Sequence, residues 1–249
     1  MLGSLLVTLR EGFEAALVVG IVLAYLRKSG ATDRVRVVWL GVAAAAVVSV
    51  LAGTLLFVSG HELKGSAEKI CEGGTMLLAA TLLTWMIFWM RRQASASASS
   101  HGLHAKVSSA LVAGTTALFW VAFVAVAREG IETALFLFAA AGKDSAVATF
   151  AGGLTGLVVA VALGVAVYRG GRRLNLRLFF NVTGLALLGF SAYLLYGSLH
   201  EFGELAGSEL LEIGGIVGAV GYVLLVVWLY LRPPAWLARP PAGTRRQIA

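Results

Sequence analysis

The chain has 249 residues, of which 59% are hydrophobic and 13% are charged, with a formal net charge of +7. This composition excludes an ordinary soluble domain and is typical of polytopic membrane proteins. A single cysteine, Cys71, excludes an internal disulfide bond and a thiolate metal site.

Seven apolar stretches are long enough to cross a bilayer, which takes about 20 helical residues. They cover residues 4–26, 36–59, 70–90, 108–140, 147–168, 177–199 and 210–231. The fourth is longer than a bilayer requires, so we expect it to be tilted, kinked or preceded by an interfacial turn. We predict an all-α, polytopic protein of the cell membrane with a seven-helix domain over 1–231. A cytoplasmic Ala/Ser linker at about 93–106 and a basic, proline-containing cytoplasmic tail over 232–249 complete the predicted organisation.

The basic residues between the spans predict the orientation, because Lys and Arg concentrate in cytoplasmic loops. Fifteen of the twenty lie after spans one, three and five and in the tail, whereas the opposite loops hold only Lys64, Lys69 and Lys143. We therefore predict an external N-terminus and a cytoplasmic C-terminus. The net positive charge then comes from the predicted cytoplasmic loops and tail, which face anionic lipid. We therefore predict no nucleic-acid partner.

Acidic residues gather on the predicted outer side, where eight of the thirteen lie in or beside loops. Such a surface attracts cations. Glu68 and Glu72 share a helix face, as do Glu209 and Glu212. We predict an outer relay site formed by Glu68, Glu72, Glu209, Glu212, His61, Glu62, His200 and Glu201. The alternative is that the loop acids are simply solvated.

Two segments place the same three charges inside an apolar span. "LREGFEAALVVG" (9–20) contains Arg10, Glu11 and Glu14, and "AREGIETALFLF" (127–138) contains Arg128, Glu129 and Glu132. Residues three and four apart share a helix face, so each motif forms one polar stripe. Six unpaired charges in a bilayer would cost roughly 15–20 kcal/mol, so they must pair or line a wet cavity. Pairing of Arg10 with Glu14 and of Arg128 with Glu132 leaves two carboxylates over.

The surplus carboxylates indicate a pathway for a multivalent cation, because hard cations prefer carboxylate oxygens and soft Cu(I) prefers Cys or Met. We predict that Glu11, Glu14, Glu129 and Glu132 bind metal and that Arg10 and Arg128 balance charge. The alternative is that both motifs only pin helices together. Spans one and four run in opposite directions, as in inverted repeats. However, the similar segments 61–74 and 200–215 join parallel spans, so the repeat relation stays open.

The doubled pentapeptide, "REGFE" and "REGIE" in spans one and four, resembles the paired motif of the FTR-type high-affinity iron permeases. "LTWMIFWMRR" (83–92), "RLNL" (173–176) and "HE" (200–201) extend the resemblance over nearly the whole chain. Phe13 and Ile131 stand where the family usually has Leu, and both are apolar. The resemblance implies iron uptake across the cytoplasmic membrane, with the six motif residues in the permeation pathway. It also implies an extracytoplasmic iron-oxidising or iron-binding partner protein.

Two other functions stay open at this point. A permease for another divalent ion, manganese or lead, would use the same carboxylates. An intramembrane acid–base enzyme is the more distant alternative, since paired Glu and His can exchange protons. No nucleophile motif, zinc-binding motif or cofactor fingerprint occurs, so we predict no enzyme and no permanently bound cofactor. Iron is then the transported substrate, the lipid bilayer is the surroundings, and an oligomer remains possible.

Overall fold

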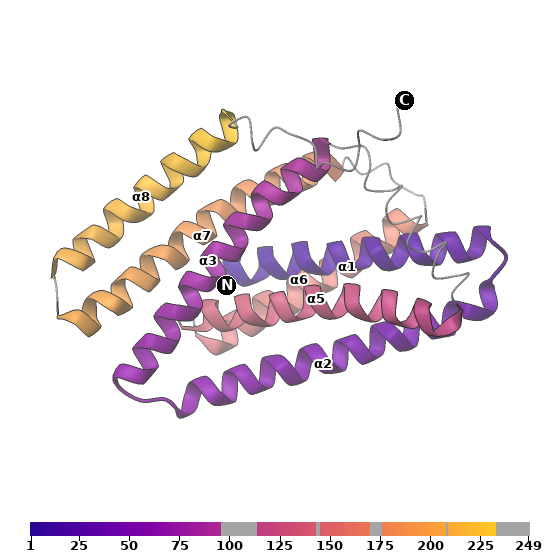
Figure 1. Cartoon of the computed structure of the whole chain (residues 1–249), viewed down its shortest axis with the longest axis horizontal. Helices are drawn as coiled ribbons and strands as arrows, with labels where there is room; N and C mark the ends of the chain where they lie inside the picture. Colours follow the sequence, from indigo (N-terminus) through magenta and orange to yellow (C-terminus); the bar gives the residue numbers. More distant parts are fainter. Residues whose placement is uncertain (96–113, 143–144, 170–175, 208, 233–249) are drawn as a thin grey trace.

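The computed structural model of the chain describes residues 1–95, 114–142, 145–169, 176–207 and 209–232. Within these ranges it contains helices and no strand, which confirms the predicted all-α fold. The helices follow in chain order (Figure 1): α1 (Leu2–Lys28), the 3₁₀ helix η1 (Thr32–Arg34), α2 (Val35–Glu62), α3 (Ser66–Ser95), α5 (Thr115–Ala141), α6 (Ala146–Tyr168), α7 (Leu176–Ala206) and α8 (Glu209–Leu231).

The helix boundaries differ from the predicted spans, most clearly in α3, α5 and α7. α3 continues to Ser95, into the predicted linker, and residues 96–106 lie outside the described residues. α5 begins at Thr115, directly after Gly114, whose φ of 105° suits glycine alone. α7 extends to Ala206, so His200 and Glu201 belong to a helix rather than a loop. The first residues of the predicted fourth span, 108–113, and the tail beyond residue 232 also lie outside the described ranges.

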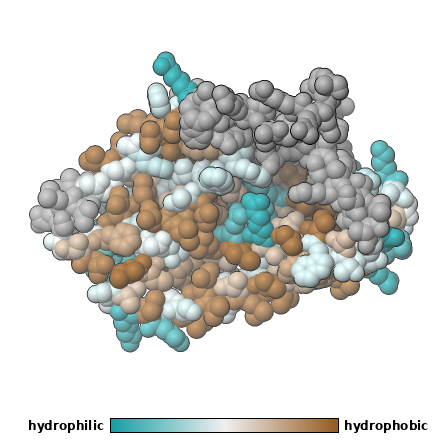
Figure 2. Space-filling model, viewed as in Figure 1, coloured by the Kyte–Doolittle hydropathy of each residue, from teal (hydrophilic) through white to brown (hydrophobic). Residues whose placement is uncertain are grey.

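In the part of the chain that the structure describes, four helices are long and apolar enough to cross a membrane: Thr32–Gly60, Ser66–Trp89, Ala146–Tyr168 and Leu178–Ala206. α1 and α5 have comparable length, but the charges of the two motifs interrupt their apolar sequences. The apolar stretch of α8, Gly214–Leu229, is shorter. Hydrophobic residues are prominent on the coloured part of the visible face (Figure 2), as expected for a chain that lies in a bilayer.

Small residues let several helix pairs approach closely, as is common in membranes. α1 packs most extensively against α6, where a Cβ at Gly156 would overlap the backbone of Leu5. α2 packs along α5, where a Cβ at Gly41 would lie 2.6 Å from the carbonyl oxygen of Phe119. α3 packs along α7, and α7 also packs against α8. These pairs leave α1 and α5 in contact with each other.

The first three helices, α1 to α3, make the same contacts as the next three, α5 to α7, when α1 is matched with α5, α2 with α6 and α3 with α7. α1 pairs with α6 as α5 pairs with α2, and α1 contacts α7 as α5 contacts α3. With three helices in each half, related helices run in opposite directions, which is the arrangement of inverted repeats. The repeat relation is thus the exchange of these halves, and it brings the two motif helices together. The similarity between 61–74 and 200–215 does not follow this relation, because it involves α8.

Candidate ion-binding site

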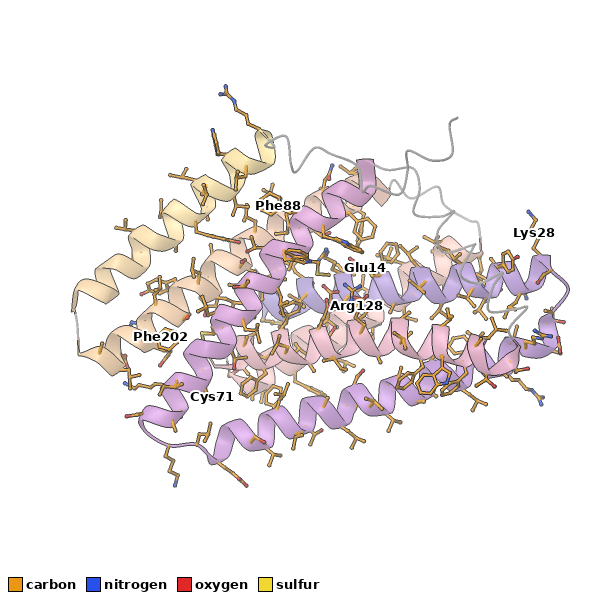
Figure 3. All side chains as sticks on the ribbon, viewed as in Figure 1. Glu14, Lys28, Cys71, Phe88, Arg128 and Phe202 are labelled. Carbon is orange, nitrogen blue, oxygen red and sulfur yellow. The ribbon has the colours of Figure 1, made fainter. Side chains whose placement is uncertain are left out.

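The two charged motifs meet in the interior of the helix bundle, where α1 contacts α5. Figure 3 places Glu14 and Arg128 near the middle of the molecule, far from Lys28 at the end of α1. A hydrophilic patch interrupts the hydrophobic surface at the middle of the same face in Figure 2. Two segments far apart in the sequence therefore form one polar centre.

The first motif is almost completely enclosed. The Arg10 side chain is 1% exposed and that of Glu11 is 0% exposed. Arg10 Nη1 donates a hydrogen bond to Glu11 Oε1 at 3.3 Å, and Arg10 Nη2 lies 3.4 Å from Glu14 Oε1. The expected Arg10–Glu14 pair is thus present. Arg10 also contacts Glu11, and pairing of residues four apart on the helix did not predict this contact.

The second motif is more open. The Arg128 side chain is 51% exposed, and its Nε donates a hydrogen bond to Glu132 Oε1 at 2.9 Å. Glu129 Oε1 lies farther away, at 3.9 Å. The guanidinium carbon of Arg128 also lies 5.6 Å from the centre of the Trp89 ring of α3, which is within cation–π range. The two motifs have the same sequence pattern but different surroundings.

Three carboxylates converge between the two motifs. Oxygens of Glu11, Glu14 and Glu129 all lie within 4.8 Å of one another. Glu11 Oε2 and Glu129 Oε2 are buried and accept no hydrogen bond from any described residue, and the buried Glu14 Oε1 has the 3.4 Å ion-pair contact with Arg10 Nη2. Unsatisfied buried carboxylate oxygens are costly, and a hard cation bound between them would remove that cost. Glu132, the fourth predicted ligand, instead accepts the Arg128 hydrogen bond and does not belong to this group.

The glycine of each motif lies at a close helix contact. A Cβ at Gly12 would lie 2.9 Å from Ala160 Cβ of α6. A Cβ at Gly130 would overlap Ser49 Oγ of α2. The motif glycines therefore let the helices that carry the carboxylates pack against the helices behind them. No role was predicted for these glycines, although a Gly recurs between the two Glu residues of each motif.

The predicted outer acids lie near the ends of α2, α3, α7 and α8. Glu62 and Glu68 are exposed, and Glu72 lies beside Gly142, which follows α5. The side chains of His61, Glu209 and Glu212 lie outside the described residues.

A local ion-pair network at this end was not predicted. Glu204 accepts a hydrogen bond from Lys69 Nζ at 2.6 Å and lies 3.2 Å from His200 Nε2. The spacing of His200 and Glu204 is a helical signal, but nothing in the sequence links Lys69 of α3 with a residue of α7.

Comparisons with known proteins cover most of the chain. The sequence model of the iron permease FTR1 family matches residues 1–225. The ferrous iron permease EfeU of Escherichia coli O157:H7 is 38% identical over 202 residues, which are 80% of this chain and 72% of that protein. The Yersinia pestis protein of the same name is 37% identical over 202 residues, with 80% and 71% covered. No solved structure matches the chain.

Proposed function

The chain belongs to the iron permease FTR1 family, and from this premise we propose that it imports iron ions across the cytoplasmic membrane through its two Arg-Glu-Gly-x-Glu motifs. Both relatives described above carry the name ferrous iron permease, which favours the ferrous ion as the cargo. The protein is then a transporter and not an enzyme. All seven helices span the membrane in this proposal, with the N-terminus outside and the C-terminus in the cytoplasm.

The convergence of Glu11, Glu14 and Glu129 is the observation that carries the proposal. The two motifs together contain four carboxylates and two guanidinium groups, so two negative charges remain when all are ionised. That surplus matches one divalent cation. Carboxylate oxygens are ligands suited to hard and borderline cations, and a bilayer interior offers few other reasons to bury them.

The arginines give the empty site a counter-charge. In the absence of iron, Arg10 contacts Glu11 and Glu14, while Arg128 holds Glu132. An arriving divalent ion replaces part of these contacts and competes for the carboxylates with twice the charge of a guanidinium. A monovalent ion has no such advantage, so the arginines favour multivalent cargo. The opposed helices α1 and α5 would form the site between two inverted halves.

The outer acids supply the ion in this proposal. An acidic surface raises the local cation concentration before translocation. Glu68, Glu72, Glu209 and Glu212, together with His61, Glu62, His200 and Glu201, form the proposed relay. An extracytoplasmic iron-oxidising or iron-binding protein would deliver iron to this side.

Uptake of radioactive iron tests the central site, with each rate divided by the amount of membrane-inserted protein. Glu11→Gln or Glu129→Gln should reduce uptake to background, because a neutral amide cannot replace a carboxylate for such a cation. The corresponding Glu→Asp changes should also fail, because the shorter side chain withdraws its oxygens. Asp33→Asn, in the exposed η1, is the matched control and should keep normal uptake.

Near-normal uptake in both Gln variants would leave the motifs with a purely structural role. Competition by manganese or lead separates the iron proposal from the nearest alternative. If either ion is transported at lower concentration than iron, the cargo assignment is wrong while the carboxylate site stands.

A further inference from the structure

The two arginines of the repeated motif differ in how freely their side chains can move. Arg10 is enclosed. Only 1% of its side chain is exposed, and it contacts the carboxylates of Glu11 and Glu14. Arg128 is half exposed and makes its shortest contact with Glu132. An enclosed side chain can serve only as a fixed counter-charge. A half-exposed one can leave its carboxylate without disturbing the packing of the bundle.

Arg128 also contacts an aromatic ring. Its guanidinium carbon lies 5.6 Å from the centre of the Trp89 ring. Trp89 belongs to α3, which packs against α5, so the ring comes from a different helix. The face of an indole attracts a cation, and it does so more strongly where water is scarce.

We propose that Trp89 is a positioning residue that holds Arg128 at the rim of the carboxylate cluster and leaves Glu129 available to the ion. The geometry supports this division, since Arg128 Nε lies 3.9 Å from Glu129 and 2.9 Å from Glu132. When a divalent ion binds Glu129, it repels the nearby guanidinium. The Trp89 ring then offers Arg128 an attractive surface away from the ion. Arg128 is the displaceable arginine and Arg10 the fixed one.

Removal of the ring should make Arg128 a competitor of the cargo. Without Trp89, the strongest attraction for the Arg128 guanidinium is to the carboxylates of Glu129 and Glu132. The ion must then displace the guanidinium from both carboxylates. The half-saturating iron concentration should therefore rise, while the maximal rate at high iron changes little. This inference rests on the proposed function, because it assumes that the carboxylates bind the cargo.

Trp85 provides a matched control. It lies one turn before Trp89 on α3 and is 71% exposed. Both tryptophans line a cavity of about 440 Å³. The Trp85 ring makes no cation–π contact with Arg128 in the described part of the chain, so a change at Trp85 removes a similar side chain without touching the arginine.

The test measures ferrous iron uptake and equilibrium binding of ferrous iron to the purified full chain in detergent under reducing conditions. Trp89→Leu should raise the half-saturating concentration and the dissociation constant by roughly three- to tenfold. Trp89→Phe, which keeps an aromatic face, should stay within about twofold of wild type, as should Trp85→Leu. In an Arg128→Gln background, Trp89→Leu should cause no further change in the dissociation constant.

Several results would overturn the inference. Unchanged iron affinity in Trp89→Leu would do so, as would an equal shift in Trp85→Leu. A fall in maximal rate alone would indicate a structural role for Trp89. A persistent effect in the Arg128→Gln background would show that Trp89 does not act through Arg128. If Glu129→Gln keeps normal uptake, the proposed function itself fails; if it loses uptake while Trp89→Leu is normal, only this inference fails.

Discussion

At the scale of single residues, the different burial of Arg10 and Arg128 predicts losses of stability of different size for the same substitution. Arg10→Met leaves Glu11 and Glu14 buried without their cation, and breaking a buried pair in this way costs about 3–5 kcal/mol. Arg128→Met affects a half-exposed contact, and such pairs contribute about 0–1 kcal/mol. We expect a much larger fall in the melting temperature of the purified protein for Arg10→Met.

A double variant separates pairing from ion binding. Arg10→Met combined with Glu14→Gln removes both charges and should recover part of the lost melting temperature. Uptake should nevertheless stay at background, because Glu14 is a proposed ligand. Equal destabilisation by Arg10→Met and Arg128→Met would contradict the difference in burial, and active transport by the double variant would reduce Glu14 to a pairing partner.

The sequence predicts which residues of the site are charged, but not how they are shared. Helical spacing correctly paired Arg10 with Glu14 and Arg128 with Glu132. It could not predict that carboxylate oxygens of Glu14 and of Glu129, which belong to different motifs, lie within 4.8 Å of each other. It also could not predict the Trp89 contact or the Lys69–Glu204 ion pair. These contacts join different helices, and spacing along one helix carries no information about them.

At the scale of helices, the motif glycine Gly130 sets how closely α5 can approach α2. Gly130→Ala places a Cβ against Ser49 Oγ, and overpacking of this kind typically costs about 1–3 kcal/mol. We expect a lower melting temperature and less membrane-inserted protein. Adding Ser49→Gly should restore both, because it removes the overlapping hydroxymethyl group.

Gly184→Ala on α7 is the control for this prediction, since a Cβ there would meet nothing within 4 Å. It should be neutral or slightly stabilising, because alanine favours helix more than glycine does. If Gly130→Ala is equally harmless, or if Ser49→Gly fails to rescue it, the α2–α5 contact is looser than the structure indicates.

Helix positions along the chain were predictable, whereas helix partners were not. Long apolar runs predicted α1 to α3 and α5 to α8, because a membrane span must be continuous and apolar. In a bilayer, however, the side that faces lipid is as apolar as the side that faces another helix. In α6, Leu154 is 54% exposed, while its neighbour Gly153 is buried against α1 and α5. Hydropathy alone therefore could not predict that α1 pairs with α6 and α2 with α5.

At the scale of the whole molecule, the outer acids and the central carboxylates should affect uptake differently. Changing Glu68, Glu72, Glu209 and Glu212 together to Gln should raise the half-saturating iron concentration roughly three- to tenfold and reduce the maximal rate less. The relay concentrates ions but does not form the translocation step. The measurement is uptake over a range of iron concentrations, at low and at physiological salt.

Lys69 provides a control of opposite sign for the relay. It neutralises Glu204 at the same end of the bundle, so Lys69→Gln should lower the half-saturating concentration slightly. Both effects should shrink at high salt, because exposed charges are screened over about 10 Å at 0.1 M. An unchanged half-saturating concentration in the quadruple variant would mean that these acids are simply solvated residues near helix ends.

The direction of transport depends on the orientation of the chain, and the basic residues predict it. Fifteen Lys and Arg residues lie in the three predicted inner loops and the tail, against three in the outer loops, and this bias favours a cytoplasmic position for the basic segments. Reporter fusions after residue 97 and after residue 240 should therefore score as cytoplasmic, and an insertion within 203–207 should score as external. The inserted reporter lies beside Glu204, at the end of the bundle that should receive the ion. A C-terminal reporter on the external side would place the acidic end in the cytoplasm, and the same carboxylates would then collect ions for export rather than uptake.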